Sequence, residues 1–335
     1  MTPTFEIEVK GPYRLDLTAW ALRRRPHNEI DDWDGHRFRR VLVLDGSPTT
    51  TEVRQAGDGR RPALEVTLTG VGRSPSDRAV AEARAALIGL LGLHVDLGGF
   101  YELAGRDARL TALAERFVGM RPVKFPSVFE AVVNAVACQQ LTLTAGIHRL
   151  SRLARAYGRS GPGGGTAFPD ADQLAEAQPV DIRELGFSTA RAGAIVSLAR
   201  AFHEGDFDVE ALGTLDDDGA RRALTALAGL GRWSADYTLL RGLGRWHVLP
   251  GDDVAAQNNL RRRLDLPAAV DHGVLSRLAA EWWPWGGVVY FNLLLDSLVA
   301  SGVVRTGPVQ ARSSRHRNPV DGSSEPSSIG SRQYG

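Results

Sequence analysis

Hydrophobic and polar positions alternate with a two-residue period near the start of the chain, as they do in half-buried strands. The alternating or apolar runs are residues 4–9, 39–44 and 63–69. Asp45-Gly46 after the second run is a turn signal, residues 31–35 are expected to form a loop, and residues 75–91 are typical of a helix. Residues 3–70 are therefore predicted to be mainly strand, in a small sheet that packs one face on that helix.

Helical periodicity dominates from residue 100 onward. The predicted helices are 100–118, 128–137, 141–157, 168–177, 181–185, 189–204, 220–227, 232–243, 253–264 and 288–299. Asp170 and Ser188 are expected to be N-caps, and Gly186 is expected to end the short helix before it. The Gly-rich residues 159–166 favour a flexible connection, and residues from 305 onward, dominated by Ser, Gly, Pro and Arg, are typical of disorder.

This pattern predicts an α+β fold in three parts. Residues 1–110 form a small α/β sheet domain, residues 111–304 form an all-α domain, and residues 305–335 form a basic tail. The length of 335 residues and the 43% hydrophobic content suit about two domains.

The helical part is organised around a glycine-rich turn, Leu227-Ala228-Gly229-Leu230-Gly231, that separates two predicted helices. Glycine tolerates positive φ and lets a partner approach the main chain closely. The first amides of the second helix have no intrahelical acceptor, and with the helix dipole they attract anions. A phosphate of a DNA backbone would suit this turn.

Two aromatic residues and two carboxylates follow the turn. Trp233 and Tyr237 are four residues apart and share one helical face, which is typical of core packing and is also what a pocket wall requires. A Pro-Gly loop then leads to Asp252 and Asp253 at the start of a further helix. An aspartate in that position is usually an N-cap.

This order of features resembles the helix-hairpin-helix DNA glycosylase superfamily, and most of all its bacterial 3-methyladenine DNA glycosylase II, or alkylation-repair, branch. The family's L-x-G-[IV]-G-R is matched from Leu227 to Arg232, and its W-[ST]-A-x-Y follows as Trp233-Ser234-Ala235-Asp236-Tyr237. An L-R-G follows at residues 240–242, and the likeness covers roughly residues 125–300. It implies an all-α helix-hairpin-helix glycosylase domain behind an N-terminal α/β domain.

The sequence departs from the family pattern at two places. Ala228 stands where the family has proline, and the loop before the aspartates reads Leu249-Pro250-Gly251. The second departure leaves the register open between Asp252 and Asp253.

The resemblance also implies roles for individual residues. Asp253 is the catalytic carboxylate, with Asp252 an assistant or a cap. The base pocket is formed by Trp233, Tyr237, Trp285, Gln139 and Gln140, and the DNA backbone is held by Gly229, Leu230, Gly231, Arg232 and Ser234. Gln139-Gln140 also fits a pair of helix-terminal hydrogen bonders, and Arg191 fits a scaffold or phosphate contact.

The activity implied is excision of alkylated purines such as 3-methyladenine by hydrolysis of the N-glycosidic bond. Bifunctional relatives place a lysine just after the hairpin, where this chain has Trp233, so a monofunctional enzyme that leaves an abasic site is expected. A non-catalytic helix-hairpin-helix DNA-binding scaffold and an oxidised-purine glycosylase are the alternatives.

Composition limits the partners. A single cysteine, Cys138, excludes a disulfide framework and a four-cysteine zinc or iron–sulfur site. The net charge of +1 requires a local basic surface for binding damaged double-stranded DNA. We expect a cytoplasmic, nucleoid-associated monomer without membrane contact and without a required cofactor, and a monovalent cation at the hairpin is the one candidate ligand of that kind.

Overall fold

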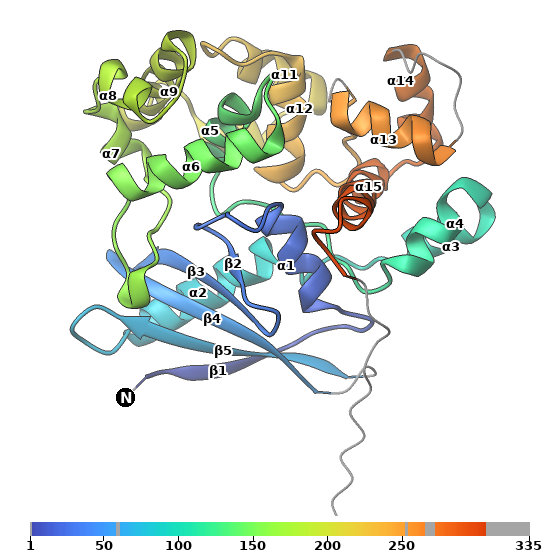
Figure 1. The fold of residues 1–335 in the computed structure, drawn as a ribbon, viewed down its shortest axis with the longest axis horizontal. Coiled ribbons are helices and arrows are strands. Elements are labelled where there is room, and N and C mark those ends of the chain that lie inside the picture. Colours follow the sequence, from blue (N-terminus) through green and yellow to red (C-terminus); the bar gives the residue numbers. More distant parts are fainter. Residues whose placement is uncertain (1, 58–60, 252–253, 265–271, 306–335) are drawn as a thin grey trace, which may run out of the picture.

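The computed structural model describes residues 2–57, 61–251, 254–264 and 272–305. An antiparallel sheet has the strand order β1-β5-β4-β3-β2. The strands are β1 (Thr4–Glu8), β2 (Asp32–Trp33), β3 (Arg37–Leu44), β4 (Ser47–Gly57) and β5 (Pro62–Gly70). The sheet lies on one side of the molecule and most helices lie on the other (Figure 1).

The helices carry most of the chain and confirm the α+β prediction. They are α1 (Leu15–Arg23), α2 (Asp77–Leu90), α3 (Gly98–Arg106), α4 (Ala108–Arg116), α5 (Val128–Cys138), α6 (Leu143–Tyr157), the 3₁₀ turn η1 (Pro162–Gly164), α7 (Ala171–Ala175), α8 (Pro179–Glu184), α9 (Thr189–His203), α10 (Val209–Thr214), α11 (Asp217–Thr225), α12 (Arg232–Arg241), α13 (Val254–Leu264), α14 (His272–Glu281) and α15 (Gly286–Ala300). Within the described ranges, no helix is both long and apolar enough to cross a bilayer.

The predicted strands are confirmed, and the turn between β3 and β4 forms as expected. Asp45 and Gly46 have φ of 46° and 70°, the left-handed pair that closes a two-residue hairpin. β4 was not predicted, because Thr49 and Thr51 occupy inward-facing positions and hide the apolar alternation. β2 falls where the sequence predicted only a loop, and its two residues pair with β3.

Residues 3–70 are mainly strand as predicted, but helix α1 within this range was not predicted. Leu17, Ala19, Ala21 and Leu22 are fully buried, while Asp16, Trp20 and Arg23 are only partly buried. The helix is short, and its first residues, Leu15-Asp16-Leu17-Thr18, alternate as they would in a strand. It ends at Arg24, whose φ of 59° is in the left-handed region.

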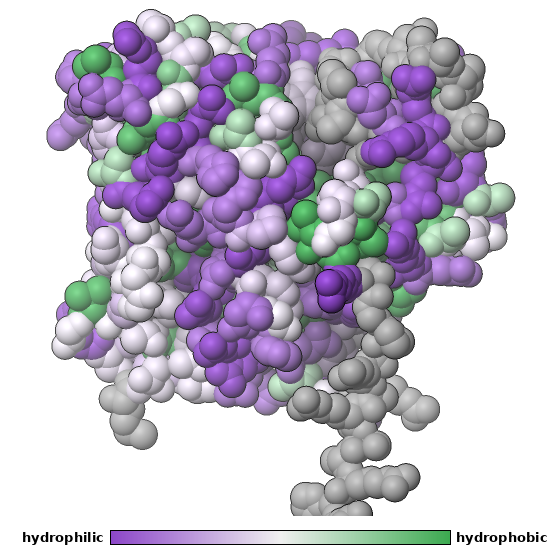
Figure 2. All heavy atoms as spheres, viewed as in Figure 1, coloured by the Kyte–Doolittle hydropathy of each residue, from purple (hydrophilic) through white to green (hydrophobic). Residues whose placement is uncertain are grey.

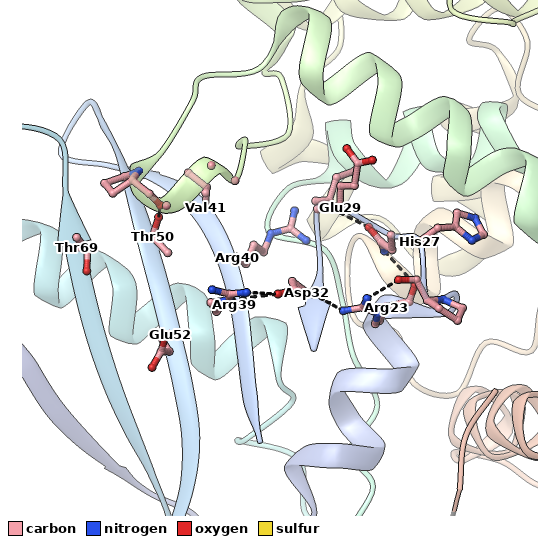
Figure 3. A pocket seen from close by; sticks show the side chains of 17 residues that line it. Arg23, His27, Glu29, Asp32, Arg39, Arg40, Val41, Thr50, Glu52 and Thr69 are labelled. Atoms are coloured by element: carbon pink, nitrogen blue, oxygen red, sulfur yellow. Dashed lines mark hydrogen bonds and ion pairs between the residues drawn. The ribbon is translucent and has the colours of Figure 1, made fainter. Parts of the chain in front are cut away.

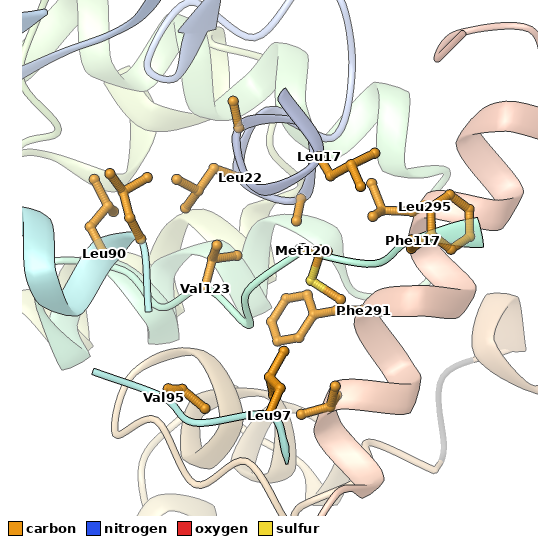
Figure 4. Close-up of a cluster of buried hydrophobic side chains, with 14 of the residues drawn as sticks. Leu17, Leu22, Leu90, Val95, Leu97, Phe117, Met120, Val123, Phe291 and Leu295 are labelled. Atoms are coloured by element: carbon orange, nitrogen blue, oxygen red, sulfur yellow. The ribbon is translucent and has the colours of Figure 1, made fainter. Parts of the chain in front are cut away.

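One hydrophobic core joins the sheet, α1 and the last helix (Figure 4). Leu17 and Leu22 of α1 lie beside Met120 and Val123 from the segment after α4, and Phe291 of α15 packs on the same cluster. Each such side chain stabilises the fold by roughly 1.5–3 kcal/mol relative to exposure. This core runs across the predicted boundary at residue 110.

A second core lies among the helices from α5 to α12. Helix α5 is buried on nearly all sides, as its apolar sequence predicts. The N-caps Asp170 and Ser188 are confirmed, and Gly186 ends α8 with a φ of 95°.

Several connections differ from the prediction. The helix predicted over 100–118 is broken at Asp107, which caps α4, and α10 and α14 were not predicted. The Gly-rich loop is ordered by the sheet, since Thr50 Oγ1 donates to the Pro162 carbonyl over 2.7 Å. All but the first residue of the predicted tail lies outside the described residues.

Candidate active site

The predicted hairpin is present between α11 and α12. Leu230 is buried at its centre and anchors the turn in the second core, while Gly229 and Gly231 are exposed on either side. Gly231 is the N-cap of α12 and has no side chain to occupy the first amides of that helix. The turn therefore offers main-chain donors at a helix N-terminus, the arrangement that binds phosphate.

The two glycines of the turn serve different purposes. Gly229 has a φ of 82°, and a Cβ there would lie 2.5 Å from the Cβ of Ala194 in α9. Gly231 has a φ of −103°, and a Cβ there would meet no atom within 4 Å. Gly229 is needed for the fold of the turn, whereas Gly231 leaves open space in front of α12.

Gln139 at the end of α5 is fastened to this turn. Its Nε2 donates to the Gly229 carbonyl over 2.9 Å and to Ser234 Oγ over 2.5 Å. Arg191 in turn donates from Nη2 to the Gln139 carbonyl over 2.6 Å. These contacts fix the half-buried Gln139 as a helix-terminal hydrogen bonder beside the hairpin.

Gln140 differs from its neighbour Gln139 in exposure and backbone conformation. It is exposed and has a φ of 49°, a conformation that is uncommon for residues other than glycine and clusters at functional sites. The strained residue lies next to the hairpin because Gln139 is bound there.

Trp233 and Tyr237 come together as predicted. Their ring centroids are 5.2 Å apart with planes 31° from parallel. Tyr237 is buried and also packs on Phe125 at 6.4 Å, while Trp233 is half-buried. The indole Nε1 of Trp233 has no hydrogen-bond partner among the described residues.

The remaining predicted residues are placed as follows. Trp285 packs on α3, 6.4 Å from the ring of Phe100, in a different part of the core from Trp233. Ser234 is buried and faces Gln139, and Arg232 is exposed at the start of α12. Asp252 and Asp253 lie outside the described residues.

A cavity of about 240 Å³ borders Gly251, the residue before the two aspartates. Arg232, His247 and Asp217 line it, and His247 Nε2 lies 2.7 Å from Asp217 Oδ2. Burial would raise the pKa of Asp217, but hydrogen bonds from Arg245 and His247 lower it below its usual value. Within the described residues, no three His, Cys, Asp or Glu side chains are grouped to hold a metal.

A cavity of about 530 Å³ lies apart from the hairpin, between the sheet and the Gly-rich loop (Figure 3). Its central carboxylate, Asp32, accepts hydrogen bonds from Arg23 and Arg39. Burial would raise the pKa of Asp32, but these two arginines lower it. The charged groups at its centre are therefore paired with one another.

Sequence reasoning missed two arginines beside the aromatic pair. Arg24 donates from Nη1 to Tyr237 Oη over 2.9 Å, and the guanidinium carbon of Arg241 lies 5.8 Å from the Tyr237 ring centroid. Arg241 was visible only as part of the L-R-G motif. Nothing in the local sequence around Arg24 signals a contact with a residue 213 positions away.

The surface over α6 is strongly hydrophilic (Figure 2). Arg152 and Arg155 are exposed on this helix, which begins three residues after Gln140. Arg155 is paired with Glu29 over 3.1 Å, so part of the charge on this surface is already neutralised.

Comparison with known proteins agrees with this geometry. Residues 133–284, which include the hairpin and the aromatic pair, match the family model described as HhH-GPD superfamily base excision DNA repair protein. The chain is 26% identical over 201 residues to the DNA-3-methyladenine glycosylase of Bacillus subtilis, covering 59% of this chain and 66% of that protein.

Longer alignments extend the similarity into the N-terminal part. The probable bifunctional transcriptional activator/DNA repair enzyme AlkA of Mycobacterium tuberculosis is 32% identical over 288 residues, which are 85% of this chain and 55% of that protein. The chain thus spans between about half and two thirds of these two curated relatives. A solved 3-methyladenine DNA-glycosylase from Archaeoglobus fulgidus has the same fold, with a TM-score of 0.76 and 23% identity over 89% of this chain and 99% of that one.

Proposed function

Because the chain belongs to the helix-hairpin-helix superfamily of base excision DNA repair proteins, we propose that it is a monofunctional DNA glycosylase that removes alkylated purines such as 3-methyladenine. The observation that carries the proposal is the open hairpin tip at Gly231 beside the contacting rings of Trp233 and Tyr237. A protein that only holds DNA would need the hairpin but not the aromatic pair.

The hairpin supplies the hold on DNA. Main-chain amides at the start of α12 bind a backbone phosphate, and such contacts position the duplex without reading its sequence. Arg232, exposed at the same place, adds a positive charge beside the phosphate. Binding through this surface is therefore expected on damaged and undamaged duplexes alike.

The aromatic pair receives the base. The N-glycosidic bond is inaccessible inside the duplex, so the nucleotide must be rotated out into a pocket. The half-buried Trp233 offers a ring face to the extruded base, and Tyr237 backs that ring. Stacking of this kind is worth roughly 1–3 kcal/mol per base.

The chemistry requires a carboxylate at the sugar. An alkylated purine is already a good leaving group, so the enzyme has mainly to stabilise the developing sugar cation or to orient the attacking water. The resemblance assigns this role to Asp253, which follows the hairpin by a fixed interval. Electrostatic stabilisation of this type is usually the largest single contribution to catalysis.

The lysine content favours hydrolysis without strand cleavage. A glycosylase that also cuts the strand commonly forms a Schiff base between a lysine and the sugar. The chain has two lysines, of which Lys10 pairs with Asp96, and Lys124 lies against Gly89 and Gly244. Trp233 occupies the position after the hairpin, so borohydride should trap no covalent protein–DNA adduct.

The proposal includes a monomer that acts on chromosomal DNA in the cytoplasm and needs no cofactor. A monovalent cation at the hairpin would share the Gly229 carbonyl with the Gln139 amide, which already donates to it. Excision rates measured in potassium and in a bulky organic cation of equal ionic strength would decide whether such a cation contributes.

The Asp253→Asn substitution tests the proposed function. Asparagine caps helices about as well as aspartate, so the melting temperature should barely change. The loss of negative charge should slow single-turnover release of 3-methyladenine by about a hundredfold or more. Activity lost in Asp252→Asn instead would move the register by one residue, and full activity in both variants would refute the assignment.

A further inference from the structure

Arg24 brings a positive charge from the N-terminal part of the chain into the candidate base pocket. It is 3% exposed and lies in the left-handed region just after α1. Its Nη1 donates to Tyr237 Oη over 2.9 Å, and its Nη2 donates to Asn134 Oδ1 over 2.8 Å. Because the guanidinium is planar and its donors are rigidly arranged, these two hydrogen bonds fix the position of the Tyr237 hydroxyl.

Arg241 places a second buried cation at the same rings. It is 1% exposed, and its guanidinium carbon lies 4.6 Å from the ring centroid of Phe125 and 5.8 Å from that of Tyr237. Burial lowers its pKa, and the charge of Arg24 lowers it further, although Tyr237 opposes this shift.

Neither arginine forms an ion pair with a carboxylate within the described residues. The partners of Arg24 are a hydroxyl, an amide oxygen and the Leu22 carbonyl, and Arg241 donates to the Ala21 carbonyl over 3.3 Å. The charge of Asp31 acts on both arginines and that of Glu130 acts on Arg24, without a hydrogen bond between them. Those two carboxylates are bound to Arg40, whereas the two guanidinium groups contact Tyr237 directly.

This charge changes what the rings can recognise. A cation is attracted to an aromatic face by the electron density of the ring. The hydrogen bond from Arg24 draws density from the phenol oxygen, and Arg241 already lies against the Tyr237 ring. A positively charged base would also meet two like charges in a medium of low dielectric constant.

The charge acts on the leaving base as well. When the C1′–N9 bond of a neutral purine breaks, the electron pair stays on N9 and the base carries negative charge until it takes up a proton. Water supplies the hydroxyl that bonds to C1′ and releases a proton, which balances the one taken up by the base. A purine whose ring is already positively charged by N-alkylation departs as a neutral base. Positive charge beside the pocket therefore favours excision of the neutral purine relative to excision of the cationic one.

We propose that Arg24 is a specificity-determining residue, which lowers the preference of the pocket for positively charged alkylpurines and allows neutral damaged purines to be excised beside them. The proposal rests on the glycosylase function proposed above. It gives the N-terminal part of the chain a role in substrate choice.

The test compares two duplexes of identical sequence, one with a single 7-methylguanine and one with a single hypoxanthine, under single-turnover conditions. The quantity measured is the ratio of the cationic to the neutral excision rate. Arg24→Met should raise this ratio about tenfold, and Arg24→Lys, which keeps the charge, should leave it near the wild-type value. An unchanged ratio in Arg24→Met would overturn the proposal.

A matched control separates charge selection from loss of packing. Arg121 is also buried, and its Nη2 donates to the Lys10 carbonyl, away from Tyr237. Arg121→Met should lower the melting temperature without moving the ratio, and a ratio that rises as in Arg24→Met would count against the proposal.

Two milder variants keep the test decisive if Arg24→Met does not fold. Arg24→Gln removes the charge but retains an amide donor, and Tyr237→Phe removes the acceptor that lets Arg24 draw density from the ring. Each should raise the ratio several-fold, and no change in either would overturn the proposal. If the wild type releases neither base but does release 3-methyladenine from an alkylated duplex, the proposal about Arg24 fails and the glycosylase function stands, whereas release of none of the three bases would refute the glycosylase function.

Discussion

At the scale of single residues, Trp233 combines a half-buried ring with an indole nitrogen that has no partner among the described residues. Burying such a donor without an acceptor costs about 1–3 kcal/mol. The buried hydroxyl of Tyr13 in the core also has no partner among the described residues, so an orphaned donor does not by itself identify a ligand site. The half-buried ring face of Trp233 is the part of the side chain that a stacked base could cover.

Trp233→Ala should therefore slow excision of 3-methyladenine by about one to two decades, the equivalent of 1–3 kcal/mol of stacking realised in the transition state. Binding to undamaged duplex should be nearly unchanged. Single-turnover rates and fluorescence anisotropy would measure the two effects. Trp33→Ala is the control, because Trp33 is half-buried in the sheet, and equal losses of excision in both variants would mean that the effect is only structural.

The sequence indicated the parts of the site that are close together in the chain. The turn and the Trp233–Tyr237 pair lie within about three helical turns, so their spacing determines their geometry. Arg24 reaches Tyr237 across 213 positions, and such a contact depends on how α1 packs rather than on any local pattern. Trp285 was placed in the pocket by resemblance alone, and that role stays a prediction.

At the scale of elements, the hairpin is held by Gln139 and Leu230 while its tip stays open. Substitutions at Gly229 and Gly231 should distinguish the contacts that stabilise the hairpin in the fold from those that bind DNA. Gly229→Ala should destabilise the protein, because the new Cβ would lie 2.5 Å from Ala194 and φ is 82°.

Gly231→Asp should instead fold normally. Its Cβ meets no atom within 4 Å, and aspartate is a good N-cap. Its carboxylate would occupy the first amides of α12 and repel phosphate, so affinity for damaged and undamaged duplexes should fall at least tenfold. Anisotropy titrations at moderate salt, beside a melting curve, would measure this, and unchanged affinity would show that the hairpin does not hold DNA.

The elements that the sequence predicted are those with local signals. The caps Asp170 and Ser188 and the turn Asp45-Gly46 act within a few residues, and all three are confirmed. α1 and β4 were missed because their local sequences do not show the expected periodicity. The short helix begins with the strand-like alternation Leu15-Asp16-Leu17-Thr18, and the strand places the polar Thr49 and Thr51 inward.

At the scale of the whole molecule, buried charges join the sheet to the helices. Arg40 of β3 donates to Asp31 over 2.5 Å and to Glu130 of α5 over 2.6 Å, and all three side chains are at most 5% exposed. Burial would lower the pKa of Arg40, but the two carboxylates raise it above its usual value. Glu130 lies one helical turn before Asn134, so the same face of α5 also holds Arg24.

Arg40→Met should lower the free energy of unfolding by about 3–5 kcal/mol, because it leaves two carboxylates buried without their cation. Burial already raises the pKa of Glu130, against the opposing charge of Arg40. Without that charge the pKa in the folded state rises further above its unfolded value of about 4.3. The protonated form then stabilises the variant below that pH, and this stabilisation is lost as the pH rises through the folded pKa. The deficit relative to the wild type, measured by urea unfolding, should be larger at pH 8 than at pH 4.5.

Arg39→Met is the control, because it removes an arginine from the half-exposed Asp32, and it should lower the free energy of unfolding by about 0–1 kcal/mol. A deficit for Arg40→Met that is equal at both pH values would mean that the two carboxylates do not depend on Arg40 for their charge.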